Sequence, residues 1–465
     1  MKRLSTACMV LLLAGCASYT ARPIDPGAQL TDLESRRLDA PDVRQFFERA
    51  LGHKLAAWPP KSWGIDTLTL AADYFQPDID VAHARSLLAQ AGVITAGARP
   101  NPTTSASFEY NTDAPAGTSP WTNGLGIAVP VETAGKRDYR IERARDLAQA
   151  ARLREADTLW QVRSRVRASL LAAYPTEDLV RRQRDLQAQI VSMLERRLTA
   201  GYASQPELTQ AHLALNRITL VLRENQKQRA ENLTRVAAAV GVPARAIEGA
   251  DLSFAVFDRL IALSDMPAEA ARRRALLSRP DVLTALADYE ATQSALQLEI
   301  ARQYPDLSLG PGYLWDAGAV KWSLGLALAL PLLNRHEGPI AEAEARRKEA
   351  AATFLAVQAK AIAEVEQAWA GYSHAIQTVD TATVLLRDQQ RNERAVSATY
   401  QAGEADRLAL LSARYETVTA ELARANALMQ AQQTLGQLED ALRTSLGADV
   451  VAPAAKRATT SRLSR

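Results

Sequence analysis

The chain has 465 residues, of which 55 are basic and 52 acidic, so its formal net charge is only +3. Such a balance lacks the overall positive field that nucleic-acid binding requires. Hydrophobic residues make up 47% and charged residues 23%, which is typical of a folded chain rather than a disordered one. Beyond residue 20 the longest apolar run, 322–333, is too short and too rich in Gly and Pro to span a membrane, so we expect no transmembrane helix in the mature chain.

The first residues have the pattern of a secretory signal. Lys2 and Arg3 precede an apolar stretch that ends in Leu-Ala-Gly-Cys at Cys16. This ending resembles the lipobox of bacterial lipoproteins, which predicts that residues 1–15 are a signal peptide and that Cys16 becomes the lipid-bearing first residue. Ala17 after the cysteine implies passage to the outer membrane. The alternative is an ordinary signal peptide with an incidental cysteine.

A proline-rich segment follows the predicted anchor. Its prolines are Pro23, Pro26, Pro41, Pro59 and Pro60. This composition predicts that residues 16–66 form an extended tether from the lipid anchor.

Two large parts of the chain carry the same landmarks about 200 residues apart, a period far too long for a solenoid repeat. We therefore predict an internal duplication with copies at 67–242 and 270–447, an inter-repeat segment at 243–269 and a disordered basic tail at 448–465. The landmarks are Gln76-Pro77-Asp78-Ile79 with Arg279-Pro280-Asp281-Val282, and Ala200-Gly201 with Ala402-Gly403.

Each copy contains two short runs in which large apolar residues alternate with small ones, such as Leu324 and Leu326 around Gly325. Period two is that of a β-strand, and about nine or ten residues is the length that a tilted strand needs to cross a bilayer. Turn-rich loops between the runs predict two β-hairpins, at 103–130 and 306–331.

Three tryptophans flank the expected hairpin tips: Trp121, Trp315 and Trp322. They could be core residues. Because one face of the expected strands is apolar and the other carries Gly, Ala and Ser, we favour an aromatic girdle at a membrane interface.

Apolar residues recur every three or four positions over 136–199 and 340–400, which is a coiled-coil pattern. At 1.5 Å per residue these helices would be about 96 and 92 Å long. Shorter return helices are expected at 206–239 and 406–446. Pro175 should kink the first long helix or mark a seam in it.

The predicted fold is mainly α with a small β part. Four strands cannot close a barrel, since the smallest filled barrel has about eight. Two chains would supply eight strands and three chains would supply twelve. The small residues on one face favour the larger, open bore.

The signal, the duplicated unit and the paired tips resemble the TolC-like outer membrane factor family. Residues 403–411 are most similar to its heavy-metal efflux, CzcC-like branch. The resemblance implies a homotrimer with a twelve-stranded transmembrane β-barrel in the outer membrane of a Gram-negative bacterium, continued by a coiled-coil helical barrel through the periplasm. It also implies an exit duct of a tripartite pump, with a periplasmic adaptor and an inner-membrane transporter of the RND type as partners. The tips are Leu198-Thr199-Ala200-Gly201-Tyr202 and Tyr400-Gln401-Ala402-Gly403-Glu404.

The resemblance also implies roles for residues at the tips. Adaptor docking is expected at Leu198, Gly201, Leu208, Gly403, Leu408 and Leu411. A closed periplasmic gate is expected at Glu207, Tyr400, Asp406 and Arg407. The arginine that the family places five residues after Tyr400 is absent, because position 405 is Ala. The family's acidic ring corresponds to Ala409 and Ser412, so we expect no cation-binding ring there. The alternative role of Glu207 is a capping charge at a helix start.

Nothing in the sequence predicts an enzyme, a cofactor or a resident metal. Ala134-Gly135-Lys136 lacks the first glycine and the hydroxyl residue of a phosphate-binding loop. The five histidines show no helical pairing. Two kinds of function remain, an export channel for metals, drugs, organic solutes or secreted proteins, and a coiled-coil envelope lipoprotein that acts as a spacer. A lipid-facing ladder of leucines favours the channel.

Overall fold

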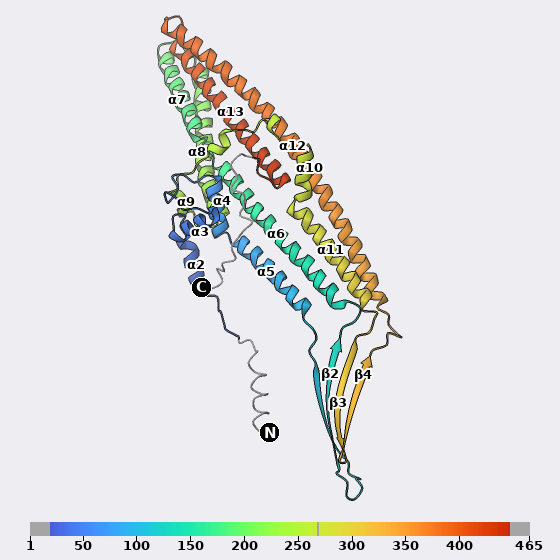
Figure 1. Ribbon diagram of the computed structural model, residues 1–465. Coiled ribbons are helices and arrows are strands. Elements are labelled where there is room, and N and C mark those ends of the chain that lie inside the picture. The colour runs from blue at the N-terminus through green and yellow to red at the C-terminus, as the bar shows by residue number, and fades with distance from the viewer. Residues whose placement is uncertain (1–18, 267–268, 447–465) are drawn as a thin grey trace.

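The structure, a computed structural model, describes residues 19–266 and 269–446. The chain forms an elongated wall of long helices that continues at one end into a narrow sheet (Figure 1). None of the helices in the described ranges is long and apolar enough to pass through a membrane. The predicted anchor at Cys16 and the tail at 448–465 lie outside the described residues.

The sheet is antiparallel and follows chain order, β1-β2-β3-β4. The prediction of a mainly α fold with four strands is confirmed. The second hairpin turn, Ala317-Gly318, is tighter than the loop expected from the sequence, and both of its residues have positive φ. The strands are β1 (Thr103–Tyr110), β2 (Trp121–Val131), β3 (Leu307–Asp316) and β4 (Ala319–Leu328).

The strand register gathers the large apolar side chains on one face of the sheet. Leu326 pairs with Leu309, which in turn pairs with Val129. The opposite face carries Gly, Ala and Ser residues in direct register. A Cβ built on Gly126 would lie 2.8 Å from Ser105 Oγ, so this face has no room for larger side chains at that pair.

Four helices next to the sheet continue the order of the strands. Their spatial order across the wall is α5, α6, α11 and α12, with each helix packed against the next (Figure 1). Because α5 leads into β1 and α12 follows β4, the same chain segments form the outer limits of both layers. The bounds are α5 (Pro77–Gly97), α6 (Lys136–Ala172), α11 (Pro280–Ala301) and α12 (Glu337–Gln401).

Toward the opposite end the wall consists of α8, α7, α13 and again α12, in that order. The wall therefore has two free edges, one formed by β1, α5 and α8 and the other by β4 and α12. The remaining bounds are α7 (Glu177–Thr199), α8 (Gln205–Val240) and α13 (Arg407–Leu442).

The two long helical stretches differ. The first is interrupted between Ala172 and Glu177, where Pro175 lies, whereas α12 runs for 65 residues without a break. Proline lacks the backbone N–H that would continue the hydrogen-bond ladder, so this seam is the one that the sequence predicts.

The extended tether predicted for 16–66 is wrong over its described part. Pro26 and Pro41 begin helices, because proline suits the first helical position, where no N–H is needed. Val43 and Phe47 are buried in a cluster with Trp63. The helices are α2 (Pro26–Ser35), α3 (Pro41–Leu51) and α4 (Ile65–Phe75); the inter-repeat segment adds α9 (Arg245–Glu248), η1 (Ala255–Asp258), η2 (Leu263–Asp265) and α10 (Glu269–Ser278).

The duplication is visible in equivalent contacts. Gln76 Nε2 donates to the Ala239 carbonyl at the end of α8, at 2.9 Å. In the second copy Arg279 Nη1 donates to the Ala441 carbonyl at the end of α13, at 2.6 Å. Each of these side chains precedes a Pro-Asp pair and binds the final turn of the return helix of its own copy.

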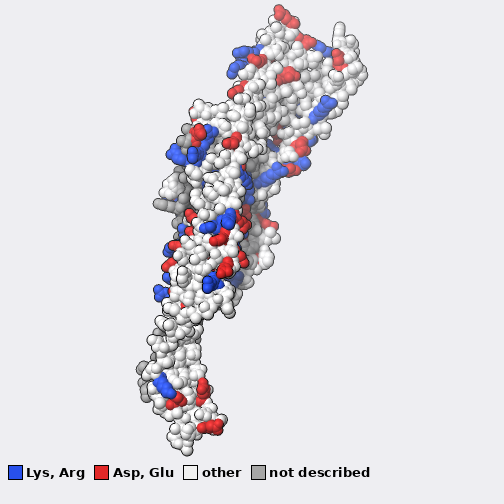
Figure 2. Space-filling model, turned by 90° about the vertical axis from the view of Figure 1, so that its right-hand side faces the viewer, with Lys and Arg blue, Asp and Glu red and all other residues white. Residues whose placement is uncertain are grey.

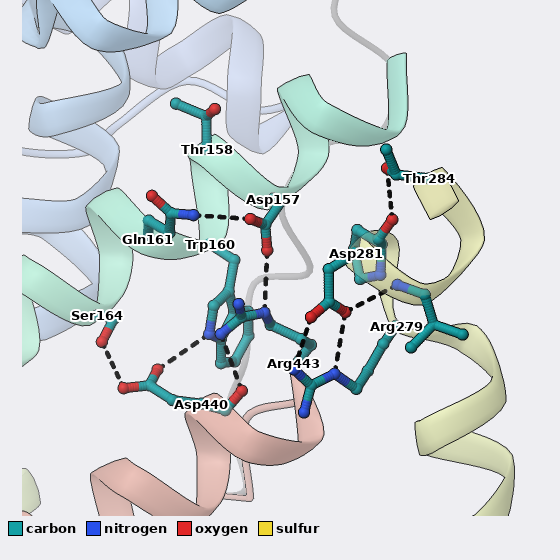
Figure 3. A network of polar contacts seen from close by, with 12 residues as sticks. Asp157, Thr158, Trp160, Gln161, Ser164, Arg279, Asp281, Thr284, Asp440 and Arg443 are labelled. Carbon is teal, nitrogen blue, oxygen red and sulfur yellow. Dashed lines mark hydrogen bonds and ion pairs between the residues drawn. The ribbon is translucent and has the colours of Figure 1, made fainter. Parts of the chain in front are cut away.

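Polar contacts join the two copies in the middle of the wall (Figure 3). Trp160 Nε1 and Ser164 Oγ on α6 donate to the carboxylate of Asp440 on α13, at 2.9 and 2.6 Å. Arg443, just beyond α13, pairs with Asp157 at 3.0 Å. These directional contacts fix how the first copy packs against the second.

Candidate functional site

The far end of the sheet carries aromatic residues on its apolar face. Trp121 packs edge-on against Tyr110 and Trp322 against Tyr313, with ring centroids 5.0 and 5.1 Å apart. Trp322 is 79% exposed and Trp315 half-buried. The register places all three predicted tryptophans on one face. The ring contacts of Tyr110 and Tyr313 were not predicted from the sequence, because each tyrosine packs on a tryptophan of a neighbouring strand.

The small-residue face ends in charged groups at the same end of the sheet. Asp316 accepts hydrogen bonds from Thr122 Oγ1 at 3.0 Å and from Lys321 Nζ at 2.7 Å. Figure 2, which faces the α12 side, shows charges over the helices and a small group of charges at the far end of the strand part, with few charges between them.

Lys136 is a structural residue at the junction of sheet and helices. Its side chain is 8% exposed and Nζ donates to the Tyr304 carbonyl at 2.6 Å and to Asp306 at 2.7 Å. It therefore ties the turn before α6 to the turn before β3.

Each helical tip reverses at a glycine. Gly201 has φ +80° and Gly403 has φ +78°, as expected where the chain must turn between two helices. A Cβ on either glycine would meet open space, so the positive φ, and not crowding, disfavours other residues there.

One ion pair joins the two tips. Arg197 Nη2 on α7 lies 2.5 Å from Asp406 Oδ2, with the arginine side chain 31% and the aspartate side chain 50% exposed. Asp406 is also the N-cap of α13, since Oδ1 accepts the Ala409 N–H at 2.7 Å. The hydrogen bond from Arg197 lowers the pKa of Asp406 below its usual value, and the Ala409 N–H adds to this. Asp406 was among the gate residues predicted from the sequence, whereas Arg197 was not.

Glu207 forms a capping box with Ser204. Its carboxylate accepts the Ser204 N–H at 2.8 Å, while Ser204 Oγ accepts the Glu207 N–H at 3.4 Å. The Ser204 N–H thereby lowers the pKa of Glu207. Tyr400 is 38% exposed, and within the described part of the chain no hydrogen bond joins it to Glu207. Arg407 is exposed.

Two of the predicted docking leucines are not available on the surface of the chain. Leu208 is 8% exposed and packs with Val191 and Ala211 between α7 and α8. Leu411 is 3% exposed. The prediction failed for them because helical spacing alone cannot separate a buried face from an exposed one. Leu198 and Leu408 are half-buried, and Tyr202, which the analysis did not single out, is 84% exposed.

No group of three or more His, Cys, Asp or Glu side chains within 19–266 and 269–446 is placed to hold a metal ion.

The family model for "Outer membrane efflux protein" matches residues 75–242 and 271–444, which together are well over half of the chain. The chain belongs to the outer membrane efflux protein family. Each matched segment lies within one of the two copies expected from the sequence, and each contains one β-hairpin and one helical tip.

Two relatives of this efflux protein have been named for different cargoes. It is 29% identical to the cobalt-zinc-cadmium resistance protein CzcC of Cupriavidus metallidurans over 248 residues, which cover 50% of this chain and 56% of that protein. It is 26% identical to the pyoverdine export outer membrane protein OpmQ of Pseudomonas aeruginosa over 477 residues, which cover 94% and 97%. The match thus spans little more than half of the first relative and nearly all of the second.

Solved structures of outer membrane channels share the fold of this efflux protein. The outer membrane protein VceC of Vibrio cholerae superposes with a TM-score of 0.66 at 21% identity, covering 82% of this chain and 97% of VceC. CusC superposes with a TM-score of 0.65 at 18% identity, covering 92% and 99%. The family model thus confirms the predicted membership of the outer membrane factors, and the solved structures confirm the fold.

Proposed function

We propose that three copies of this efflux protein close into a continuous tube, which forms the outer-membrane exit duct of a tripartite export pump. The family assignment supports the coarser function, efflux through the outer membrane. The assembly, the partners and the cargo are the finer parts of the proposal.

The observation that carries the proposal is the pair of free edges along the wall. The outer edges of β1 and β4 have no strand partner among the described residues, and unpaired backbone groups cannot be left in hydrocarbon. The helices on both free edges also expose large apolar side chains, which a neighbouring copy would cover. These are Val81, Leu88 and Ile94 on α5, Leu213 and Leu220 on α8, and Leu355, Ile362, Val384 and Leu385 on α12.

The faces of the sheet favour three copies over two. An eight-stranded barrel has an interior that side chains must fill, whereas larger barrels leave an aqueous bore. The inward face would carry glycines and serines such as Gly126 and Ser105, which cannot fill a barrel. Twelve strands from three copies fit this surface, with the leucine face toward lipid and the tryptophan–tyrosine pairs at its boundary.

The helical tips form the periplasmic end in this proposal. Leu198, Gly201, Gly403 and Leu408 remain candidates for contacts with the adaptor. The Arg197–Asp406 pair holds the two tips of one chain together and supports a gate at this end. Glu207, Tyr400 and Arg407 would take part through contacts between subunits.

The cargo proposed here is a heavy-metal cation, and the name of CzcC supports it. Pyoverdine, which the name of OpmQ gives as the exported compound, is the second candidate, because OpmQ matches nearly the whole chain. Lipid attachment at Cys16 and an RND-type transporter belong to the same proposal. A strain that lacks its own outer duct separates the two cargoes, because its growth can be challenged with zinc or cobalt and its medium assayed for exported pyoverdine.

A Gly403→Trp substitution tests the docking end. The bulky residue at a positive φ should distort the tip and abolish efflux, while the trimer still inserts in the outer membrane. Efflux equal to that of the unmodified protein would contradict the assignment, and Leu333→Trp, at a fully exposed position away from the tips, is the control.

A further inference from the structure

Helix α2 has no buried residue in the structure of the single chain. Leu30 and Leu33, one helical turn apart, are 56% and 41% exposed, and the preceding Ile24 is 81% exposed. Helices this short are not stable through their own hydrogen bonds, so α2 needs a surface to pack on. The described part of its own chain leaves this apolar stripe uncovered.

The position of α2 is set by the residues that follow it. Arg36 donates to the Phe75 carbonyl at 2.8 Å and to the Gly241 carbonyl at 2.9 Å. Leu38 is 4% exposed in the core beneath. The end of α2 is thus anchored where α4 and α8 finish, while Leu30 and Leu33 remain partly exposed.

Helix α10 offers a complementary surface at the other side of the wall. Figure 1 shows α2 on the side of α8 and α9, and α10 beside α12, both in the middle of the helical part. On α10, Arg273 and Arg274 are exposed and Leu277 is 55% exposed. Arg272 is occupied instead, because its guanidinium stacks over the Trp369 ring at 4.2 Å.

The charges of the two helices are opposite. Asp32 and Glu34 are exposed on α2, and the Asp32 carboxylate pairs with Arg36 at 3.7 Å, with the Asp32 side chain 68% exposed. An acidic, leucine-bearing stripe on the side of α8 and α9 therefore matches a basic, leucine-bearing stripe beside α12.

We propose that α2 of each chain docks onto α10 of the neighbouring copy, so that the N-terminal segment fastens adjacent subunits at mid-height. The inference rests on the proposed closure of the free edges between copies. Leu30 and Leu33 pack against Leu277, while Asp32 and Glu34 face Arg273 and Arg274. Such a head-to-tail contact is repeated around a closed ring, so every subunit gives one α2 and receives one.

Cysteine cross-linking of the full-length protein tests this contact. The chain has 2 natural cysteines, Cys8 and Cys16, so the Leu33→Cys single variant serves as the background control. Leu33→Cys with Leu277→Cys, treated with a flexible bis-maleimide, should give covalently linked dimers and trimers on denaturing gels. Leu33→Cys with Val384→Cys is the matched control, because Val384 is 49% exposed on the same edge but nearer the tips, and it should give none.

Charge reversal supplies the second arm of the test. Arg273→Glu with Arg274→Glu should lower the cross-linked fraction severalfold, and adding Asp32→Arg with Glu34→Arg should restore it. A protein that is trimeric by native mass spectrometry but shows no link between subunits, or only a link within one chain, would overturn this inference and leave the proposed function standing. A protein that does not form a trimer would overturn both.

Discussion

Asp406 combines two roles where the second tip turns into α13. Oδ1 caps the helix by accepting the Ala409 N–H, and Oδ2 pairs with Arg197 of the other tip. The two roles can be separated experimentally, because asparagine caps a helix about as well as aspartate but carries no charge.

Asp406→Asn should release the link between the tips and leave the start of α13 intact. We expect higher single-channel conductance in planar bilayers, and Arg197→Gln should raise it to a similar extent, with no further increase in the double variant. Asp406→Ala should in addition destabilise the start of α13, by about 1 kcal/mol as is typical of a lost N-cap. Unchanged conductance in both single variants would remove this pair from the gate.

The pH dependence of the tip follows from the lowered pKa of Asp406. Because the pKa of Asp406 is lower in the folded tip than its ordinary value of 3.8, the ionised carboxylate stabilises the tip at every pH above 3.8. This stabilisation is lost only as the pH falls through the lower pKa of the folded state. The link should therefore persist between pH 7 and pH 5. Conductance that rises steeply over that interval in the unmodified protein, but not in Asp406→Asn, would contradict it.

Residue-level features were predictable from the sequence where they are local. The Ser204-x-x-Glu207 spacing gives the capping box, and a glycine between two long helices gives the positive φ at Gly201. The partner of Asp406 was not predictable, because Arg197 lies 209 positions away and only the packing of the two copies brings them together.

The elements were predicted best where one periodicity dominates. Strict alternation gave the strands, three- and four-residue spacing gave the long helices, and Pro175 gave the break between α6 and α7. Helices α2 and α3 were missed because the prolines of 16–66 suggested an extended chain. Pro26 and Pro41 lie at helix starts, and burial of Phe47 and Trp63, a tertiary effect, stabilises the segment.

Neighbouring residues of β4 should respond differently to the same substitution. Leu326→Arg places a charge on the apolar face and should cost about 2 to 4 kcal/mol if the position is near the middle of the bilayer. Ala327→Arg, on the small-residue face, should leave assembly intact and lower conductance by narrowing the bore. Unfolding in lipid vesicles and conductance measure the two effects, and equal destabilisation by both variants would show that the faces are wrongly assigned.

For the whole molecule, the decisive feature is the order of the segments across the wall. The sequence predicts four strands per chain and the need for further chains to close a barrel. The side-by-side order of α5, α6, α11 and α12 was not predictable, because it depends on contacts between the two internal repeats of one chain. The order matters because it places β1, α5 and α8 on one free edge and β4 and α12 on the other over the full length of the chain.

Closure of these edges by three copies is most directly tested by native mass spectrometry of the full-length protein purified in detergent. The account predicts one dominant species with the mass of three chains, which Leu326→Arg depletes more than Ala327→Arg does. A monodisperse species of two chains, or a stable single chain under conditions in which the protein still forms channels, would contradict it.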